Sequence, residues 1–232
     1  TRTSASGTFY VLNQKEQSIP IVFIHGVGLN YEIWQPQLDF FTNYSTLAYD
    51  ILGHGKSSLK KQNISFDDFS DQLIKLINEL NFQKIHLVGF SIGSLIARNF
   101  ATKFNDRLQS LVLLGSIYKR TEQQQKIVNE RFNQAKKELK LSKLALKRWF
   151  TDKYLENNPD TYDKISSILS SNNMANFIKV YELFVNHKND EDFEKITVNT
   201  LITTGENDIG STIEMSKELN KIIKNSQLKI IK

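Results

Sequence analysis

The sequence predicts an α/β fold, in which a mostly parallel sheet has helices on both faces and is interrupted by a helical insertion. Two observations predict it. Short, almost continuously apolar runs recur along the chain, as in strands buried on both faces, and amphipathic helical patterns separate them. With 232 residues, 40% of them hydrophobic, the chain is large enough to bury a substantial core as one α/β unit.

Six apolar runs are the expected strands, at 19–24, 46–49, 85–88, 111–114, 201–203 and 228–231. The clearest helix follows Ser65, a residue type that caps helix N-termini, and has Asp67 and Asp68 in its first turn, where the helix dipole favours negative charge. Its apolar residues form one stripe: Phe66, Phe69, Leu73, Leu76, Ile77 and Leu80. Further helices are expected at 92–104 and about 212–223. This alternation predicts βαβ units.

The alternation stops between residues 116 and 198. Helical patterns at 127–149 and 175–185 fill this stretch, and no strand pattern occurs in it. We therefore expect a core domain of residues 1–116 and 198–232, with a helical lid of residues 117–197 packed on it. The segment 119–148 is strongly basic, which predicts a solvated helix face; the weaker alternative is that it steers anionic, carboxylate-bearing substrates.

Composition excludes several classes of protein. The chain has no cysteine, which rules out disulfides and thiolate chemistry and suits a reducing, cytoplasmic compartment. A net charge of +5 is too modest to indicate nucleic acid as a partner. No apolar run is long enough to span a membrane. Complete nucleotide-binding glycine motifs and histidine pairs with metal-ligand spacing are also missing, so we expect no cofactor and no metal.

One motif carries chemistry. Gly89-Phe90-Ser91-Ile92-Gly93 lies directly between an expected strand and an expected helix, which is the setting of a nucleophile elbow. A serine on such a sharp turn needs glycines two residues away on either side, because larger side chains would clash. The helix N-terminus that follows also favours an oxyanion. Ser91 is therefore the candidate nucleophile.

A second turn supplies the matching donor. The first expected strand runs into His25-Gly26-Val27-Gly28, where backbone is exposed at the carboxyl edge of the sheet. The backbone N–H groups of Ile92 and Val27 are the expected oxyanion hole, each donor contributing about 3 kcal/mol to transition-state stabilisation. The alternative is an ordinary glycine turn.

With these residues the chain resembles the α/β-hydrolase superfamily, in the branch of small esterases, enol-lactonases, cofactor-free haloperoxidases and carbon–carbon bond hydrolases. The resemblance covers nearly the whole chain and adds Tyr49-Asp50-Ile51-Leu52-Gly53-His54-Gly55-Lys56-Ser57 and Gly205-Glu206-Asn207-Asp208 to the motifs above. The stretch Gly28-Leu29-Asn30, Trp34 and Pro36-Gln37 looks most like 3-oxoadipate enol-lactonases. The resemblance implies the α/β-hydrolase fold.

The resemblance also implies the acid of a catalytic triad. The family places it after the strand that follows the lid, three residues after a glycine, which makes Asp208 the candidate and Glu206 its competitor. Asp50 ends an earlier strand, where such a carboxylate usually bonds the backbone of its own loop. We expect that structural role for it.

The sequence contains no histidine at the position where the family places the catalytic base. The family order is Ser, Asp, His, but all four histidines of this chain, His25, His54, His86 and His187, precede Asp208. We expect all four to be structural, with His25 orienting the oxyanion loop. Relatives place the catalytic histidine after the strand expected at 228–231, so we expect a C-terminally truncated chain whose histidine lies just beyond Lys232. The alternative is a non-catalytic ligand-binding pseudo-hydrolase.

The predicted function is a serine hydrolase that acts on a small carboxylic ester or lactone through an acyl-enzyme. Phe90, Trp34 and Trp149 are expected to bind the substrate, and most of the candidate aromatics could equally belong to the core. The other candidates are Phe177, Tyr181 and Phe184 in the lid. Carbon–carbon bond hydrolase and haloperoxidase activity remain open, because those reactions use the same triad.

Overall fold

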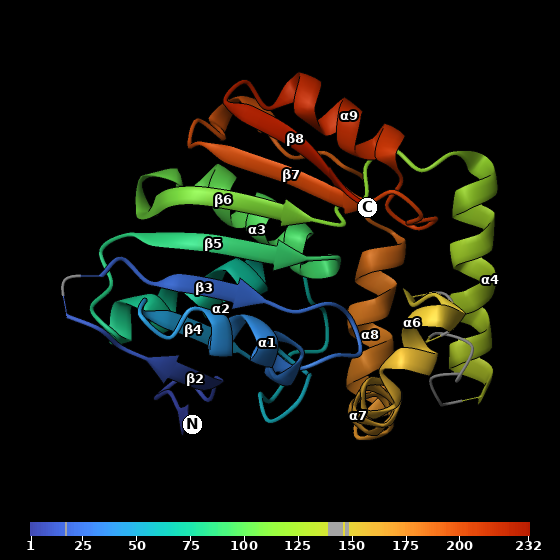
Figure 1. The fold of residues 1–232 in the computed structure, drawn as a ribbon, viewed down its shortest axis with the longest axis horizontal. Coiled ribbons are helices and arrows are strands. Elements are labelled where there is room, and N and C mark those ends of the chain that lie inside the picture. Colours follow the sequence, from blue (N-terminus) through green and yellow to red (C-terminus); the bar gives the residue numbers. More distant parts are fainter. Residues whose placement is uncertain (17, 139–145, 147–148) are drawn as a thin grey trace.

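In the computed structural model, eight strands form one sheet in the order β1-β2-β4-β3-β5-β6-β7-β8, with the helices arranged around it (Figure 1). The structure describes every residue except 17, 139–145 and 147–148. Strands β3 to β8 pair in parallel, and β1 and β2 add two antiparallel pairings, β1 with β2 and β2 with β4, at one edge. The predicted α/β-hydrolase fold, with its mostly parallel sheet, is confirmed.

The strands are β1 (Arg2–Thr3), β2 (Phe9–Asn13), β3 (Ile21–Ile24), β4 (Thr46–Tyr49), β5 (Ile85–Phe90), β6 (Leu108–Leu114), β7 (Thr200–Gly205) and β8 (Ser226–Ile231). All six expected strands are present. Strand β5 continues to Phe90, so the elbow begins inside the strand. The antiparallel pair β1 and β2 was not predicted.

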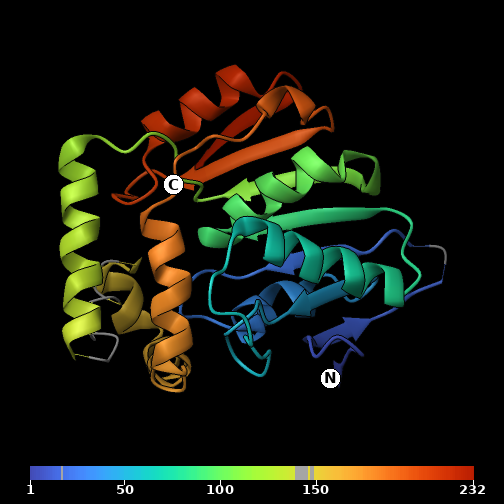
Figure 2. The ribbon, with the colours of Figure 1, turned by 180° about the vertical axis from the view of Figure 1, so that it is seen from behind.

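The two faces of the sheet are covered by different helices. α2 (Phe66–Glu79), α3 (Ile92–Lys103) and α9 (Ile213–Ile222) bury their apolar residues in one core with the main strands, and Figure 2 shows α2 and α3 on this face. On the other face, η1 (Tyr31–Trp34) and α1 (Gln35–Phe40) lie near β3 and β4. A short helix, η2 (Asn105–Arg107), precedes β6.

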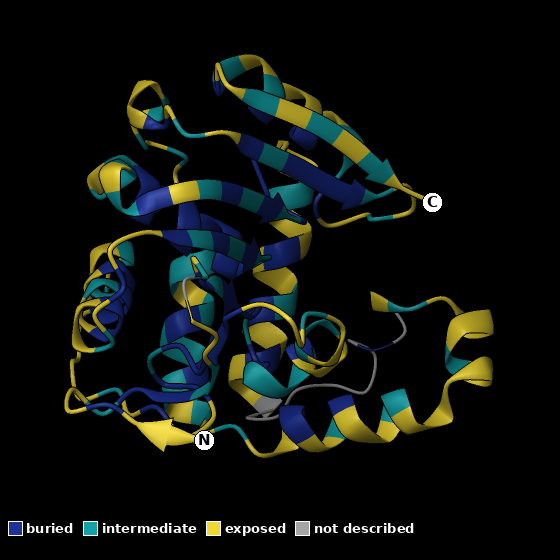
Figure 3. Ribbon diagram, turned by 60° about the vertical axis from the view of Figure 1, so that its left-hand side comes forward, coloured by how far each residue is buried: buried dark blue, intermediate teal, exposed yellow. Residues whose placement is uncertain are grey.

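Burial follows the position of each strand in the sheet. Every residue of β4 is buried, as expected for an inner strand, whereas β8 alternates intermediate and exposed residues along the opposite edge (Figure 3). The cap predicted at Ser65 is also present. Ser65 and Asp68 form a reciprocal capping box at the start of α2. The side chain of Thr212 caps α9, which was not predicted.

Between β6 and β7, the regular elements that the structure describes are all helices. They are α4 (Glu122–Glu138), α6 (Asp152–Asn157), α7 (Pro159–Ser170), α8 (Met174–Val185) and η3 (Phe193–Lys195). The α-helices of this segment stand beyond the carboxyl ends of the parallel strands, and α4 packs along α8 (Figure 1).

The helix expected at 127–149 begins earlier, at Glu122, and residues 139–145 and 147–148 of that prediction lie outside the described residues. The division into core and lid stays a prediction. Within the described ranges, no helix has both the length and the apolar character needed to cross a bilayer.

Candidate active site

Ser91 lies at the sharp turn between β5 and α3, in a backbone conformation that few residues other than glycine adopt. Its φ is 57° and its ψ is −121°. A Cβ on Gly89 would lie 2.2 Å from the carbonyl oxygen of Gly93, and a Cβ on Gly93 would lie 2.5 Å from that of Ile24. Only glycine fits at either position. The geometry of a nucleophile elbow is therefore present.

The backbone N–H groups of Val27 and Ile92 have no hydrogen-bond acceptor within the described residues. Ile92 is the first residue of α3, where N–H groups lack partners inside the helix and the helix dipole is positive. Val27 lines the same cavity as Ser91. The N–H of Ser91 itself donates to the carbonyl oxygen of Leu114 over 3.0 Å and ties the turn to β6. Two free donors are what a developing oxyanion requires.

Two buried histidines hold the loop that carries Val27. Nε2 of His54 accepts the N–H of Gly28 over 2.8 Å, and Nε2 of His25 accepts the N–H of Ile51 over 3.1 Å. Burial lowers the pKa of His25 to about 3 and the pKa of His54 to about 4, so both rings are neutral and able to accept at neutral pH. The loop-orienting role expected of His25 is confirmed, and His54 shares it.

Asp208 lies in the loop after β7 and lines the same cavity as Ser91. One carboxylate oxygen accepts the N–H groups of Gly210 and Ser211, each over 2.8 Å. The other lies 3.4 Å from the hydroxyl of Thr204. The competing carboxylate, Glu206, is exposed and does not line the cavity.

Asp50 bonds the backbone of its own region, as expected. Its two carboxylate oxygens accept the N–H groups of Tyr31, over 2.9 Å, and Lys56, over 2.8 Å. A Cβ on Gly55 would clash with this carboxylate. Asp50 therefore joins two loops.

The remaining two histidines are also held by structural contacts. Nδ1 of His86 lies 2.6 Å from the hydroxyl of Ser110 on the neighbouring strand. Nε2 of His187 lies 3.1 Å from the carboxylate of Glu191. All four histidines are among the described residues, and none of them lines the cavity that contains Ser91.

That cavity has a volume of about 300 Å³ and lies between the strand ends and the helical segment. Of the predicted site residues it brings together Ser91, Asp208, Val27, Phe90 and Trp149. The lid aromatics Phe177, Tyr181 and Phe184 line it as well. The walls are thus mostly apolar and aromatic, with the candidate nucleophile and acid at one end of the sheet.

Trp34 does not lie with this group. It is 4% exposed and packs in the core against Phe23, with ring centroids 4.9 Å apart. The side chain of Ile92 is fully buried as well, which leaves only its backbone available to the site. From its position in the sequence, Trp34 could line the cavity or belong to the core. Its packing against Phe23 of β3 places it in the core.

Sequence reasoning missed two cationic residues of the cavity, Arg120 and Arg131. Both belong to the basic segment that was expected to be a solvated face. The available signal was the spacing of Arg120, Gln124, Ile127 and Arg131, which places them on one side of a helix. That spacing alone does not tell which side faces a cavity.

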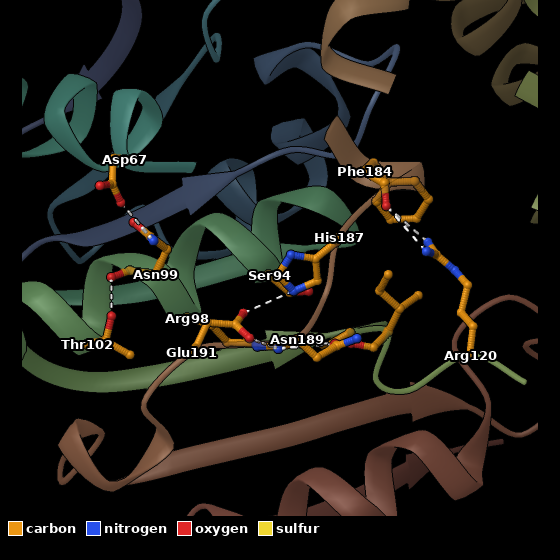
Figure 4. A network of polar contacts seen from close by, with 12 residues as sticks. Asp67, Ser94, Arg98, Asn99, Thr102, Arg120, Phe184, His187, Asn189 and Glu191 are labelled. Carbon is orange, nitrogen blue, oxygen red and sulfur yellow. Dashed lines mark hydrogen bonds and ion pairs between the residues drawn. The ribbon is translucent and has the colours of Figure 1, made fainter. Parts of the chain in front are cut away.

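Arg98, His187 and Glu191 form a buried ionic cluster (Figure 4). Arg98, on α3, is fully buried and donates to the carbonyl oxygen of Ile117 over 2.8 Å and to Glu191 over 2.7 Å. Burial alone would raise the pKa of Glu191, but the contact with His187 and the charge of Arg98 outweigh it and lower that pKa to about 2. Through Arg98, helix α3 is thereby joined to the chain that enters the helical segment, at Ile117, and to the chain that leaves it, at Glu191.

No group of three or more His, Asp or Glu side chains that could hold a metal ion occurs in the part of the chain that the structure describes. The polar groups gathered at the cavity are a hydroxyl, a carboxylate, two guanidinium groups and backbone amides. This set can support attack on a carbonyl group and stabilisation of the resulting charge.

A family profile described as the alpha/beta hydrolase fold matches residues 19–232. The chain belongs to the α/β-hydrolase family. Among characterised members of this family, it is 30% identical to the (E)-2-((N-methylformamido)methylene)succinate hydrolase of Acinetobacter baylyi, over 86% of this chain and 76% of that protein. It is 23% identical to 3-oxoadipate enol-lactonase 2 of the same species, over 91% of this chain and 79% of that protein.

Solved structures of α/β-hydrolases share the fold. The enol-lactonase from Burkholderia xenovorans superposes with a TM-score of 0.89 at 21% identity, covering 97% of this chain and 87% of that one. One of the two Acinetobacter baylyi relatives is named as a hydrolase and the other as an enol-lactonase, which supports a hydrolase. The predicted resemblance to enol-lactonases is confirmed.

Proposed function

We propose that this α/β-hydrolase cleaves a small carboxylic ester or lactone through an acyl-enzyme on Ser91. One observation carries the proposal. A serine strained at the end of β5 opens into the same cavity as Asp208 and the loop of Val27. The names of the relatives, which include enol-lactonases, favour a lactone or a similarly activated carbonyl.

In the proposed reaction, the hydroxyl oxygen of Ser91 attacks the carbonyl carbon while a histidine takes its proton. The N–H groups of Val27 and Ile92 hold the negative charge that develops on the carbonyl oxygen. Asp208 orients the histidine, which then protonates the leaving oxygen. Water activated by the same base hydrolyses the acyl-enzyme and restores Ser91.

The base of this mechanism is absent from the cavity lining. We propose that it comes from residues that follow β8. This placement is supported by the contact between the N–H of Glu206 and the carbonyl oxygen of Ile231, 2.8 Å apart, which puts the end of β8 beside the loop of Asp208. A histidine entering from there would reach the acid without crossing the sheet.

The test is hydrolysis of p-nitrophenyl acetate by the full-length product of the gene. Ser91→Ala should lower turnover by about a thousandfold or more, because the covalent step is lost. Ser58→Ala, which removes an exposed hydroxyl, is the control and should leave the rate unchanged.

The second candidate is a ligand-binding pseudo-hydrolase, and the observation that favours it is the lack of a histidine among the cavity residues. It predicts equal background rates for the unsubstituted protein and Ser91→Ala. That result would contradict the hydrolase proposal and would remain compatible with a pocket that only binds a ligand.

A further inference from the structure

The residue that follows Val27 in the loop after β3 is held on both sides. Gly28 has a φ of 78°, a conformation that glycine adopts readily and other residues rarely. Its N–H donates to Nε2 of His54 over 2.8 Å, and its carbonyl oxygen accepts a hydrogen bond from the side-chain amide of Asn172 over 2.7 Å. The two peptide groups that follow the N–H of Val27 are therefore both fixed by side chains from elsewhere in the fold.

Asn172 reaches this loop from the short connection between α7 and α8, which lies beside the loop (Figure 1). Its amide nitrogen also lies 3.2 Å from the carbonyl oxygen of Ile168 and 3.1 Å from that of Leu169, in the last turn of α7. All three partners are carbonyl oxygens, so the NH2 group of the amide must face them, and it has two hydrogens to donate. Asn172 thus joins the end of α7 to the loop of Val27.

The carbonyl group of Gly28 depends on this one side chain. Within the described residues, no other donor reaches its oxygen. Glycine has the widest range of backbone conformations of any residue, so Gly28 itself does little to resist rotation of the peptide that follows it. The orientation of that peptide is therefore set by Asn172 rather than by local backbone preference.

The start of α8 also packs against the histidine that holds the other side of Gly28. Phe177 is 1% exposed, and its ring lies edge-on to the ring of His54, with centroids 6.4 Å apart. A Cβ on Gly53, the residue before His54, would lie 3.1 Å from the Cβ of Asn176. This close packing fixes the α7–α8 connection against the loops that carry Val27 and His54.

We propose that Asn172 is a positioning residue for the oxyanion hole, whose amide holds the peptide after Gly28 so that the N–H of Val27 stays turned toward the carbonyl group that Ser91 attacks. The inference rests on the proposed function. Asn172 does not line the cavity, so it acts through the backbone of the loop. Its loss should weaken binding of the transition state, in which the oxyanion is formed, more than binding of the substrate.

The experiment measures inhibition of the full-length product of the gene by phenylboronic acid and by benzyl alcohol. The oxygen of a serine hydroxyl bonds to boron and its proton is released, which leaves a negative tetrahedral boronate with an oxygen in the oxyanion hole. Benzyl alcohol fills the cavity without such an adduct. Asn172→Ala should weaken phenylboronic acid by about tenfold, less than the roughly hundredfold expected on removal of a donor, and benzyl alcohol by less than about twofold. For p-nitrophenyl acetate, kcat and kcat/KM should both fall by about tenfold.

Ser171→Ala is the matched control. Ser171 is the neighbouring, exposed residue, and its hydroxyl donates to the carbonyl oxygen of Ile168 over 2.8 Å without reaching the loop of Val27. This variant should keep both inhibition constants and kcat within about twofold of the unsubstituted protein, because it removes only a bond to the end of α7. Unchanged thermal midpoints show that both variants are folded.

Two results would overturn the positioning role of Asn172. Equal changes in Asn172→Ala and Ser171→Ala would mean that Asn172 only terminates α7. Equal weakening of both inhibitors by Asn172→Ala would mean that the whole cavity is distorted. Failure of the proposed function is a different result, equal turnover by the unsubstituted protein and Ser91→Ala.

Discussion

Ser91 owes its position to the two glycines that flank it rather than to any hydrogen bond of its own side chain. A positive φ at a serine is strained by about 1–3 kcal/mol. The turn leaves no room for larger residues on either side of it, since a Cβ on Gly89 would lie 2.2 Å from the carbonyl oxygen of Gly93 and a Cβ on Gly93 would lie 2.5 Å from that of Ile24. The elbow at Ser91 could be predicted from the sequence, because such a turn can be built with few residue types.

Gly93→Ala should therefore destabilise the protein by about 3 kcal/mol or more, because backbone atoms rather than flexible side chains occupy the space. The measurement is the free energy of unfolding in urea. Gly205→Ala is the control: its Cβ would meet nothing within 4 Å, so the change should stay within about 1 kcal/mol. Similar losses for both variants would contradict the close packing of the elbow.

The buried histidines His25 and His54, beside the loop of Val27, give the protein a pH-dependent stability. The folded protein keeps His54 neutral down to about pH 4, whereas the unfolded chain takes up that proton near 6.5. Between these values the unfolded state binds more protons, so acid favours unfolding. Stability should fall as the pH drops through this range.

For His54 this loss is on the order of 3 kcal/mol between pH 6.5 and 4. In His54→Gln, whose amide oxygen can still accept the N–H of Gly28, the loss on acidification should be smaller by about that amount. Unfolding in urea at several pH values measures the difference. Parallel pH profiles for the two proteins would show that His54 titrates normally in the folded state.

Helix α3 joins the site to the rest of the molecule. Its first residue supplies a candidate oxyanion donor, and two turns later Arg98 reaches the ionic cluster with His187 and Glu191. An arginine inside an otherwise apolar helical pattern was the sequence signal for this cluster. Its partners come from beyond α8, and no local pattern connects residues so far apart in the chain.

Glu191→Gln should destabilise the protein by about 3–5 kcal/mol, because it leaves the fully buried Arg98 without its anion. Chemical denaturation measures the change. Glu194→Gln, a nearby exposed position, should cost less than about 0.5 kcal/mol. If both variants lose the same small amount, the ionic cluster does not stabilise the fold.

Across the whole molecule, the inner parallel strands were predictable because burial on both faces makes them short apolar runs, and the edge strand β8 was predictable from its apolar residues although it is not buried. Strand β1 was not, since two residues carry no pattern. Ser91, the loop of Val27 and the loop of Asp208 all follow strand ends, which meet at one edge of a parallel sheet. Their convergence on one cavity could therefore be expected from topology.

The helical side of the cavity could not be predicted in this way. Which face of α4 turns inward depends on its packing against α8, through Val128, Phe132 and Val185. The same limit applies to Trp34, whose place in the core is decided by Phe23. Residues that act through the position of a helix thus require the three-dimensional structure, whereas residues at strand ends do not.

The central claim is that Ser91 forms an acyl-enzyme. It is tested most directly in the polypeptide read to its stop codon, by rapid acid quenching of its reaction with p-nitrophenyl acetate and mass spectrometry of the peptides. The account predicts one acetyl group on the peptide that contains Ser91, present early in the reaction and absent in Ser91→Ala. Turnover with no acyl group on that peptide, or an acyl group that persists in Ser91→Ala, would contradict it.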